Sequence, residues 1–226
     1  WGSALAKVLC ECENDVTVWS PIEAEVNELN STHLHKNLKG ITIPDGVKYT
    51  TSIKDTCLDK DFIFFVVPSV FIRSTAEKIK EYVNEKQALV IASKGIEEST
   101  LMTLTDVVKD VLSDGDRSKY NDIVAFSGPA HAEEVAAGMP TTIVSACKRM
   151  KKAEDVEALF RKSCIRVYTN PDVIGVELCG AIKNVIALAC GISSGLGFGD
   201  NTRAALITRG IAEITRLGMS MGCAEQ

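Results

Sequence analysis

Hydrophobic positions along the chain alternate between two spacings, which predict strands and helices in turn. Continuous apolar runs at residues 61–68, 88–93 and 122–127 are typical of strands that are buried on both faces of a parallel sheet. Shorter β-rich runs predict further strands at residues 15–19, 47–50, 141–147 and 165–169. Helical spacing separates them at residues 3–13, 21–30, 69–84, 100–112 and 153–162. This alternation predicts an α/β fold with a doubly wound sheet.

The pattern changes at residue 171, after which only helical spacing continues. Two long helices are predicted at residues 172–190 and 201–221. Pro171 interrupts the preceding strand, and Asp172 can cap the helix that follows. We therefore expect a nucleotide-binding domain over residues 1–170 and the start of an all-α domain over residues 171–226.

Composition and charge argue against nucleic-acid-binding, disulfide-bonded and membrane-spanning classes of protein. The 226 residues carry a net charge of −5, which argues against a general nucleic-acid surface. The eight cysteines form no C-x-x-C pair, so we expect reduced thiols in a cytosolic protein and no metal site. The apolar run at residues 173–192 nearly reaches the length of a membrane span, but it contains Glu177, Lys183 and Asn184. A buried helix of a soluble protein is the better interpretation.

Lys183 and Asn184 lie in the middle of this apolar helix, where a lysine without a partner is costly. Helical spacing places small residues on the lysine's own face, among them Gly180 and Ala187. Glu177, the nearest acid, falls on a different face, so an ion pair within the helix would be poor. A lysine in apolar surroundings can serve as a proton donor or acceptor near neutral pH, and we favour this catalytic interpretation.

Other candidates follow the predicted strands, where ligands of doubly wound sheets bind. Lys94 would bring a cation to this edge, Phe71 an aromatic ring, and Gly128 a close backbone approach. Gly2 could be the last glycine of a dinucleotide loop, where it would allow close helix–strand packing. His131 fits an ordinary helix start better than proton transfer. The glycine-rich turn at residues 195–203 could bind phosphate at a helix N-terminus or could simply hold a capping Asp200.

Taken in order, the motifs resemble those of the NAD(P)-dependent glycerol-3-phosphate dehydrogenases of the soluble, bacterial-like type. The matching stretches are WGSALA, VVPS, SKG, SGPAHAEEVAAGMPTT, VYTNPDVIGVELCGAIKNV, GISSGLGFGDNTRAALITRG and EITRLGMSMG. The resemblance implies a Rossmann-like, mostly parallel sheet followed by a helical domain. It also implies reversible reduction of dihydroxyacetone phosphate to sn-glycerol 3-phosphate with NAD or NADP as cofactor, which would feed glycerophospholipid synthesis in the cytoplasm.

The resemblance also assigns roles to residues. Lys183 would be the catalytic acid and base. The substrate would be bound by Lys94, Gly128, Ala130 and Asn184. The cofactor would be bound by Trp1, Gly2, Phe71, Lys94 and Ala132.

Several features depart from the family pattern. Ala130 stands where the family usually has Ser or Thr, which puts one polar substrate contact in doubt. No charge near Ser20 and Pro21 selects NADH over NADPH. The resemblance implies that the first strand and the C-terminal part of the family's fold lie outside the chain. We therefore expect the 226 residues alone to be inactive and Lys183 to be more exposed than its apolar run indicates, and we expect the complete protein to be a homodimer.

Two alternatives stay open at this stage. One is a β-hydroxyacid dehydrogenase of the same architecture, which would also use a Lys and a nearby Asn on the helix after the nucleotide domain. The other is a non-catalytic nucleotide-binding module. The presence of Lys94, Lys183 and Asn184 favours an enzyme.

Overall fold

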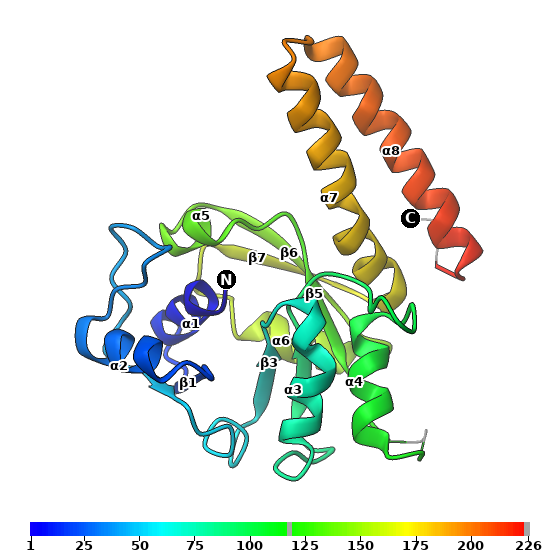
Figure 1. The fold of residues 1–226 in the computed structure, drawn as a ribbon. Helices are drawn as coiled ribbons and strands as arrows, with labels where there is room; N and C mark the ends of the chain where they lie inside the picture. The colour runs from blue at the N-terminus through cyan, green and yellow to red at the C-terminus, as the bar shows by residue number, and fades with distance from the viewer. Residues whose placement is uncertain (117–118, 224–226) are drawn as a thin grey trace.

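A five-stranded sheet forms the centre of the computed structural model, which describes residues 1–116 and 119–223 (Figure 1). Its strands, in spatial order, are β3 (Phe62–Phe65), β4 (Ala88–Ile91), β5 (Val124–Ser127), β6 (Thr141–Ala146) and β7 (Ile165–Asn170). Neighbouring strands run parallel except β5 and β6, which are antiparallel. The prediction of a mostly parallel sheet is confirmed.

Helices cover both faces of this sheet. On one face, α3 (Ile72–Ile79) and α4 (Leu104–Ser113) pack against β3 and β4 in one hydrophobic cluster. On the other face, α1 (Gly2–Glu11) and α6 (Met150–Ala158) pack against β4, β5 and β6 in a second cluster. Phe126 and Phe160 stack within that second cluster, with their ring centroids 5.1 Å apart. Strands buried on both faces explain why β4 and β5 are continuously apolar.

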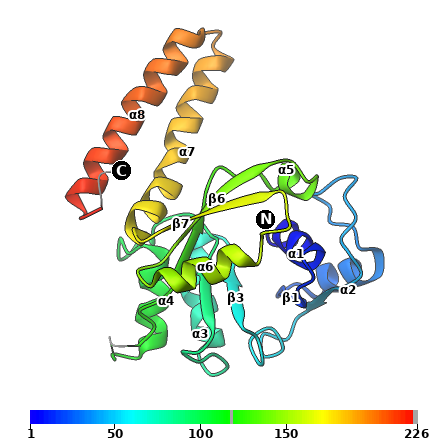
Figure 2. The same ribbon diagram turned by 180° about the vertical axis from the view of Figure 1, so that it is seen from behind.

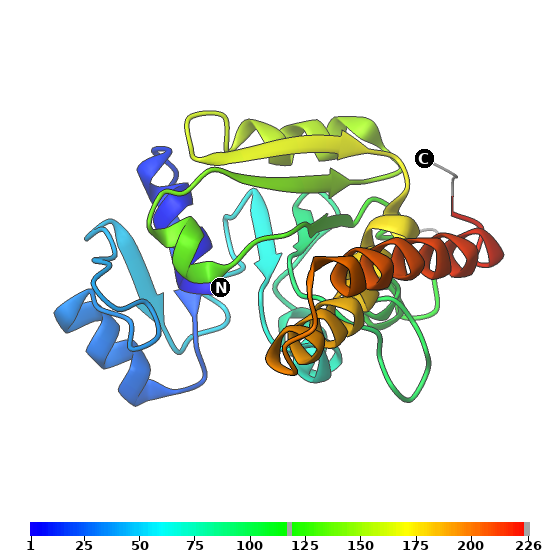
Figure 3. The same ribbon diagram turned by 90° about the horizontal axis from the view of Figure 1, so that it is seen from above.

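The first two strands form a separate parallel pair, β1 (Val16–Trp19) and β2 (Val47–Thr50), beside α2 (Glu23–Thr32). Seen from above, this blue pair stands apart from the cyan β3 (Figure 3). A cavity of 660 Å³ lies between the two sheets and is lined by β1, β3 and α1. The predicted strands are all present, and in this structure they lie in two sheets, β1–β2 and β3–β7.

The last two helices, α7 (Val173–Gly195) and α8 (Asp200–Ser220), form a hairpin that projects from the sheet domain (Figure 2). Asp172 caps α7 as predicted, because its Oδ1 accepts a hydrogen bond of 2.9 Å from the Gly175 N–H. One helix of the described residues, α7, is long and apolar enough to cross a membrane by length and composition.

The prediction that α7 is a buried helix is wrong for most of its length. Its buried residues are Leu178, Gly180 and Ser193, whereas Val185 and Leu188 are exposed. An apolar run predicts burial only when other elements cover it, and beyond its first turns α7 has mainly α8 beside it.

Several predicted helices have different bounds in the structure, among them α4, which begins at Leu104, and α7, which continues to Gly195. The segment predicted as helix at residues 69–84 contains a single 3₁₀ turn, η1 (Ser69–Phe71), and the short α3. Helix α6 begins and ends earlier than the spacing indicated. All eight cysteines are free thiols.

Candidate active site

The segment that carries Lys94 follows β4. The residues on either side of Lys94 are held in place by the end of β3 and the turn after it. Ser93 Oγ donates hydrogen bonds to the carbonyl oxygens of Val67 (2.5 Å) and Phe65 (3.2 Å), at the end of β3. Gly95 has φ = +142°, and an added Cβ would lie 2.8 Å from the Ser69 Cβ. Only glycine fits there, so the backbone itself fixes the position from which Lys94 projects.

Lys94 reaches across to the end of β5. Its Nζ donates a hydrogen bond of 2.9 Å to the carbonyl oxygen of Gly128. Gly128 must be glycine because an added Cβ would lie 2.6 Å from the Thr142 carbonyl oxygen, on the neighbouring strand β6. Burial lowers the pKa of Lys94, and the positive charge of Lys183 lowers it further.

Lys183 approaches from the helical hairpin, on α7. Its Nζ donates a hydrogen bond of 3.0 Å to Oδ1 of the adjacent Asn184. Lys183 is partly buried and Asn184 is exposed, which fits the expectation that this part of α7 is open. Glu177 bonds to Thr105 instead. Glu177 therefore does not pair with Lys183, and an ion pair between them does not explain why a lysine lies in this apolar helix.

Close packing of α7 on the sheet brings the two lysines together. Gly180 lies so near β5 that an added Cβ would be 2.4 Å from Ser127 Oγ and 3.9 Å from Lys94 Cγ. Ser127 Oγ is itself buried and has no hydrogen-bond partner within the described part of the chain. The carboxyl ends of β4 and β5 therefore meet the face of α7 that leads to Lys183, as expected for a ligand site in a doubly wound sheet.

The predicted cofactor residues gather mainly at a second place on the same edge. Trp1 and Ala132, at the starts of α1 and α5 (Ala132–Ala136), pack against one hydrophobic cluster. The first turn of α1 has no side-chain cap, so its N–H groups are available to an anion. Phe71 lies apart from them in η1, with 56% of its surface exposed.

Gly2 lies at the start of α1, near the end of β3. An added Cβ at Gly2 would lie 3.8 Å from the Val66 Cβ, which is an ordinary van der Waals contact. The assignment of Gly2 to a dinucleotide loop stays a prediction.

The remaining candidates show ordinary structural contacts. Ala130 packs against the cluster that includes Phe126 and offers no polar group. His131 is the N-cap residue of α5, and its Nδ1 lies 2.9 Å from Glu133 Oε2 on the exposed surface, which fits the ordinary helix start. Gly199, not Asp200, is the N-cap residue of α8, so the expected aspartate cap is wrong. In the described ranges, no group of three His, Cys, Asp or Glu side chains comes together to hold a metal ion.

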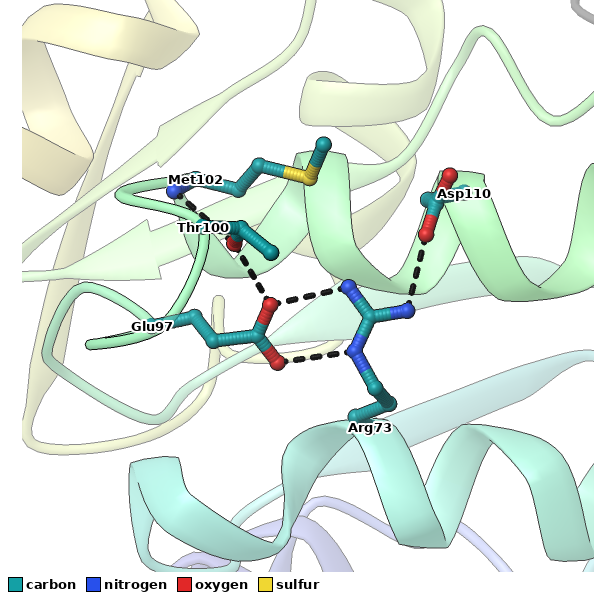
Figure 4. A network of polar contacts seen from close by, with 5 residues as sticks. All are labelled: Arg73, Glu97, Thr100, Met102 and Asp110. Carbon is teal, nitrogen blue, oxygen red and sulfur yellow. Dashed lines mark hydrogen bonds and ion pairs between the residues drawn. The ribbon is translucent and has the colours of Figure 1, made fainter.

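Sequence reasoning missed a polar network that braces the Lys94 segment (Figure 4). Arg73 on α3 binds both carboxylate oxygens of Glu97, at 2.9 and 2.8 Å, and also binds Asp110 on α4 at 2.8 Å. Thr100 Oγ1 adds a hydrogen bond of 2.6 Å to Glu97. These bonds lower the pKa of Glu97 to about 2. Nothing in the stretch IEEST distinguishes Glu97 from a solvated acid, because its partner Arg73 lies on α3, 24 residues earlier in the chain.

Comparison with known families gives the same result over both domains. The family model for the NAD-dependent glycerol-3-phosphate dehydrogenase N-terminus matches residues 1–153, and the model for its C-terminus matches residues 172–226.

Individual relatives agree. The chain is 54% identical to glycerol-3-phosphate dehydrogenase (NAD(P)+) 2 of Lactobacillus delbrueckii subsp. bulgaricus and 48% identical to glycerol-3-phosphate dehydrogenase (NAD(P)+) of Agathobacter rectalis. Both alignments cover 98% of this chain but only 66% and 65% of the relatives, so the chain spans just under two thirds of their length. The crystal structure of glycerol-3-phosphate dehydrogenase from Coxiella burnetii superposes with a TM-score of 0.90 at 34% identity. That superposition covers 99% of this chain and 67% of the other.

Proposed function

The chain belongs to the NAD-dependent glycerol-3-phosphate dehydrogenase family, and we propose that its protein interconverts dihydroxyacetone phosphate and sn-glycerol 3-phosphate with NAD(H) or NADP(H). One observation carries the proposal: α7 packs closely on the sheet one turn before Lys183, where an added Cβ at Gly180 would lie 2.4 Å from Ser127 Oγ and 3.9 Å from Lys94 Cγ. Two lysines at one edge of the sheet suit an anionic substrate with a carbonyl group.

Lys183 is the proposed acid and base. When the substrate carbonyl is reduced, a C–H bond forms at the carbonyl carbon and the π electrons of C=O move to the oxygen. The Lys183 ammonium gives that oxygen a proton, and the neutral amine takes it back in the reverse reaction. Asn184 Oδ1 accepts a hydrogen bond of 3.0 Å from Lys183 Nζ, and this bond orients the ammonium before the substrate binds.

Lys94 is proposed to hold the substrate. Its ammonium is already oriented by the Gly128 carbonyl, and its remaining N–H groups can bind a substrate oxygen. Gly128 contributes through its backbone, since its hydrogens face β6 and no side chain fits. Ala130 would line the site without a hydrogen bond, which leaves the lysines as the main polar contacts from this chain.

The residues present fit a dinucleotide at the carboxyl edge of the sheet. The uncapped start of α1, at Trp1 and Gly2, would hold a pyrophosphate, and Ala132 would lie beside it. Phe71 and Lys94 would contact the far end of the cofactor, near the substrate. When bound, the nicotinamide supplies or accepts the hydride.

We further propose that residues 1–170 and 171–226 act as separate domains, with the nucleotide on the first and the catalytic lysine on the second. The packing of α7 and α8 against one another supports the division. As part of the same proposal, the complete protein is a cytoplasmic homodimer whose product serves glycerophospholipid synthesis.

The test is a steady-state assay of NADH or NADPH oxidation by the protein expressed from its complete reading frame. Turnover with dihydroxyacetone phosphate supports the proposal. Turnover only with a β-hydroxyacid such as 3-hydroxyisobutyrate would assign the protein to another reaction. Binding of the nucleotide without turnover of either substrate would indicate a non-catalytic module.

A further inference from the structure

Glu177 faces away from the lysine that shares its helix. It lies six positions before Lys183, which places the two side chains about 120° apart around α7. Its carboxyl group is instead directed at the start of α4. Oε1 accepts a hydrogen bond of 2.9 Å from the Thr105 N–H, and Oε2 accepts one of 2.5 Å from the Thr105 hydroxyl.

The start of α4 is part of the same unit as the Lys94 segment. Ile96, two residues after Lys94, pairs with Thr103 in an antiparallel β-bridge, and the Glu97 N–H donates to the Met102 carbonyl oxygen at 3.0 Å. Thr103 is the N-cap residue of α4. Segment 94–105 is therefore a closed loop that begins at Lys94 and ends at the residue to which Glu177 binds.

Helix α7 consequently has two contacts with the sheet domain shortly before Lys183. Glu177 binds Thr105, and Gly180, one turn later, lies against Ser127 and the stem of Lys94. Two successive contacts fix both the rotation and the height of a helix. Beyond Gly180 the helix is largely exposed, so these contacts determine where the next turn, which carries Lys183, is placed.

We propose that Glu177 is a positioning residue that sets the place of Lys183 relative to Lys94 by joining α7 to the start of α4. The proposal rests on the proposed dehydrogenase function. Glu177 does not touch substrate or exchange the reacting proton; it acts through the helix. Its surroundings support this role, because burial raises the pKa of the Glu177 carboxyl and the hydrogen bonds from Thr105 oppose that rise. A carboxyl group in such a place is costly unless its hydrogen bonds are needed.

The test compares Glu177→Ala with Glu177→Gln in the complete protein. The glutamine oxygen accepts from the Thr105 N–H and its NH₂ donates to the Thr105 hydroxyl, so both contacts survive. We expect kcat for dihydroxyacetone phosphate to fall about 10- to 100-fold in Glu177→Ala, since misplacement of a catalytic group by about 1 Å has effects of this size. Glu177→Gln should recover most of the rate, and KM for the nucleotide should change less than about twofold in both. Glu154→Ala, an exposed acid on α6, is the matched control.

Two outcomes would overturn the proposal. One is a folded Glu177→Ala protein with a kcat close to that of the wild type. The other is equal loss in Glu177→Ala and Glu177→Gln, which would mean that the charge and not the hydrogen bonds matters. If Glu177→Ala does not fold, Thr105→Val removes only the hydroxyl contact, and an unchanged kcat in that variant would overturn the proposal as well.

A second readout does not depend on the reaction. Hydrogen exchange of the α7 amides around Lys183 should be faster in Glu177→Ala, or in Thr105→Val if the alanine variant does not fold, and close to wild type in Glu177→Gln. If the wild-type protein turns over no dihydroxyacetone phosphate, the proposed function fails. The exchange rates still decide whether Glu177 fixes this part of α7, and unchanged exchange in the variant that lacks the contact would overturn the inference.

Discussion

The Nζ atom of Lys94 donates a hydrogen bond of 2.9 Å to the carbonyl oxygen of Gly128, and this bond joins the ends of strands β4 and β5. It orients the ammonium at the edge of the sheet where α7 brings Lys183. The bond also gives Gly128 a function that its lack of a side chain does not reveal.

Replacement of Lys94 should weaken substrate use. Lys94→Met removes the ammonium but retains the length of the side chain, and a lost charged hydrogen bond is worth about 2 kcal/mol. We expect kcat/KM for dihydroxyacetone phosphate to fall about 30-fold. Steady-state kinetics measure this, with Lys39→Met, on an exposed loop, as the control. Equal kcat/KM in the two variants would show that Lys94 does not bind substrate.

Gly128→Ala should damage both the fold and the site. The new Cβ would lie 2.6 Å from the Thr142 carbonyl oxygen and 2.9 Å from the Ile143 Cα, and these backbone atoms cannot move aside easily. We expect a loss of about 1–3 kcal/mol in the free energy of unfolding, measured by urea denaturation. Gly191→Ala is the matched control, because nothing lies within 4 Å of its added Cβ and alanine favours the helix. A stable Gly128→Ala protein would mean that β5 and β6 are less closely packed than the structure indicates.

Arg73 should stabilise the protein through geometry as well as charge. Arg73→Lys retains the positive charge but loses the two-point contact with Glu97 and the simultaneous contact with Asp110. We expect the free energy of unfolding to fall by about 1–2 kcal/mol, observed as a lower thermal midpoint. The control is Arg161→Lys, whose single partner Glu157 lies one turn away on an exposed surface. The same loss in both variants would argue against a special role of the network.

The same network predicts that the protein loses stability at acidic pH. The pKa of Glu97 is lowered from 4.5 to about 2 by its hydrogen bonds to Arg73 and Thr100. A carboxyl whose pKa is lower in the folded state stabilises the protein above its unfolded pKa, and the contribution disappears as the pH falls from about 4.5 to about 2. Thermal midpoints of wild type and Glu97→Gln should therefore differ at pH 6 and converge by pH 2. A difference that stays constant over this range would contradict the assignment.

Much of the sheet domain follows from local sequence, and the site follows only in part. Strands β4 and β5 are buried on both faces, so their apolar runs identify them without knowledge of their neighbours. Which strands pair with which, such as β1 with β2, could not be predicted from local sequence, because strand pairing depends on contacts between distant segments. The burial of α7 was overestimated for a related reason: hydrophobicity describes a helix, but exposure depends on what packs against it.

Some residues of the site could be predicted from local sequence, and others depend on contacts between distant segments. Lys94, Gly128 and Lys183 were found because motifs and spacing mark them, and the structure brings all three to one edge. Glu177 was considered only as a partner for Lys183, since a sequence gives the face of a helix but not the element opposite that face. Its actual partner, Thr105, lies 72 residues away. Arg73 on α3 and Glu97 on the loop before α4 come together in the same way (Figure 4).

The most direct test of the account is kcat of Lys183→Met in the protein expressed from its complete reading frame. Loss of a general acid and base should lower kcat for dihydroxyacetone phosphate by about 10²- to 10⁴-fold. The thermal midpoint and the affinity for the nucleotide should remain close to wild type, because Lys183 lies on a partly exposed part of α7. A folded Lys183→Met enzyme that retains kcat within about threefold of wild type would contradict the proposed mechanism.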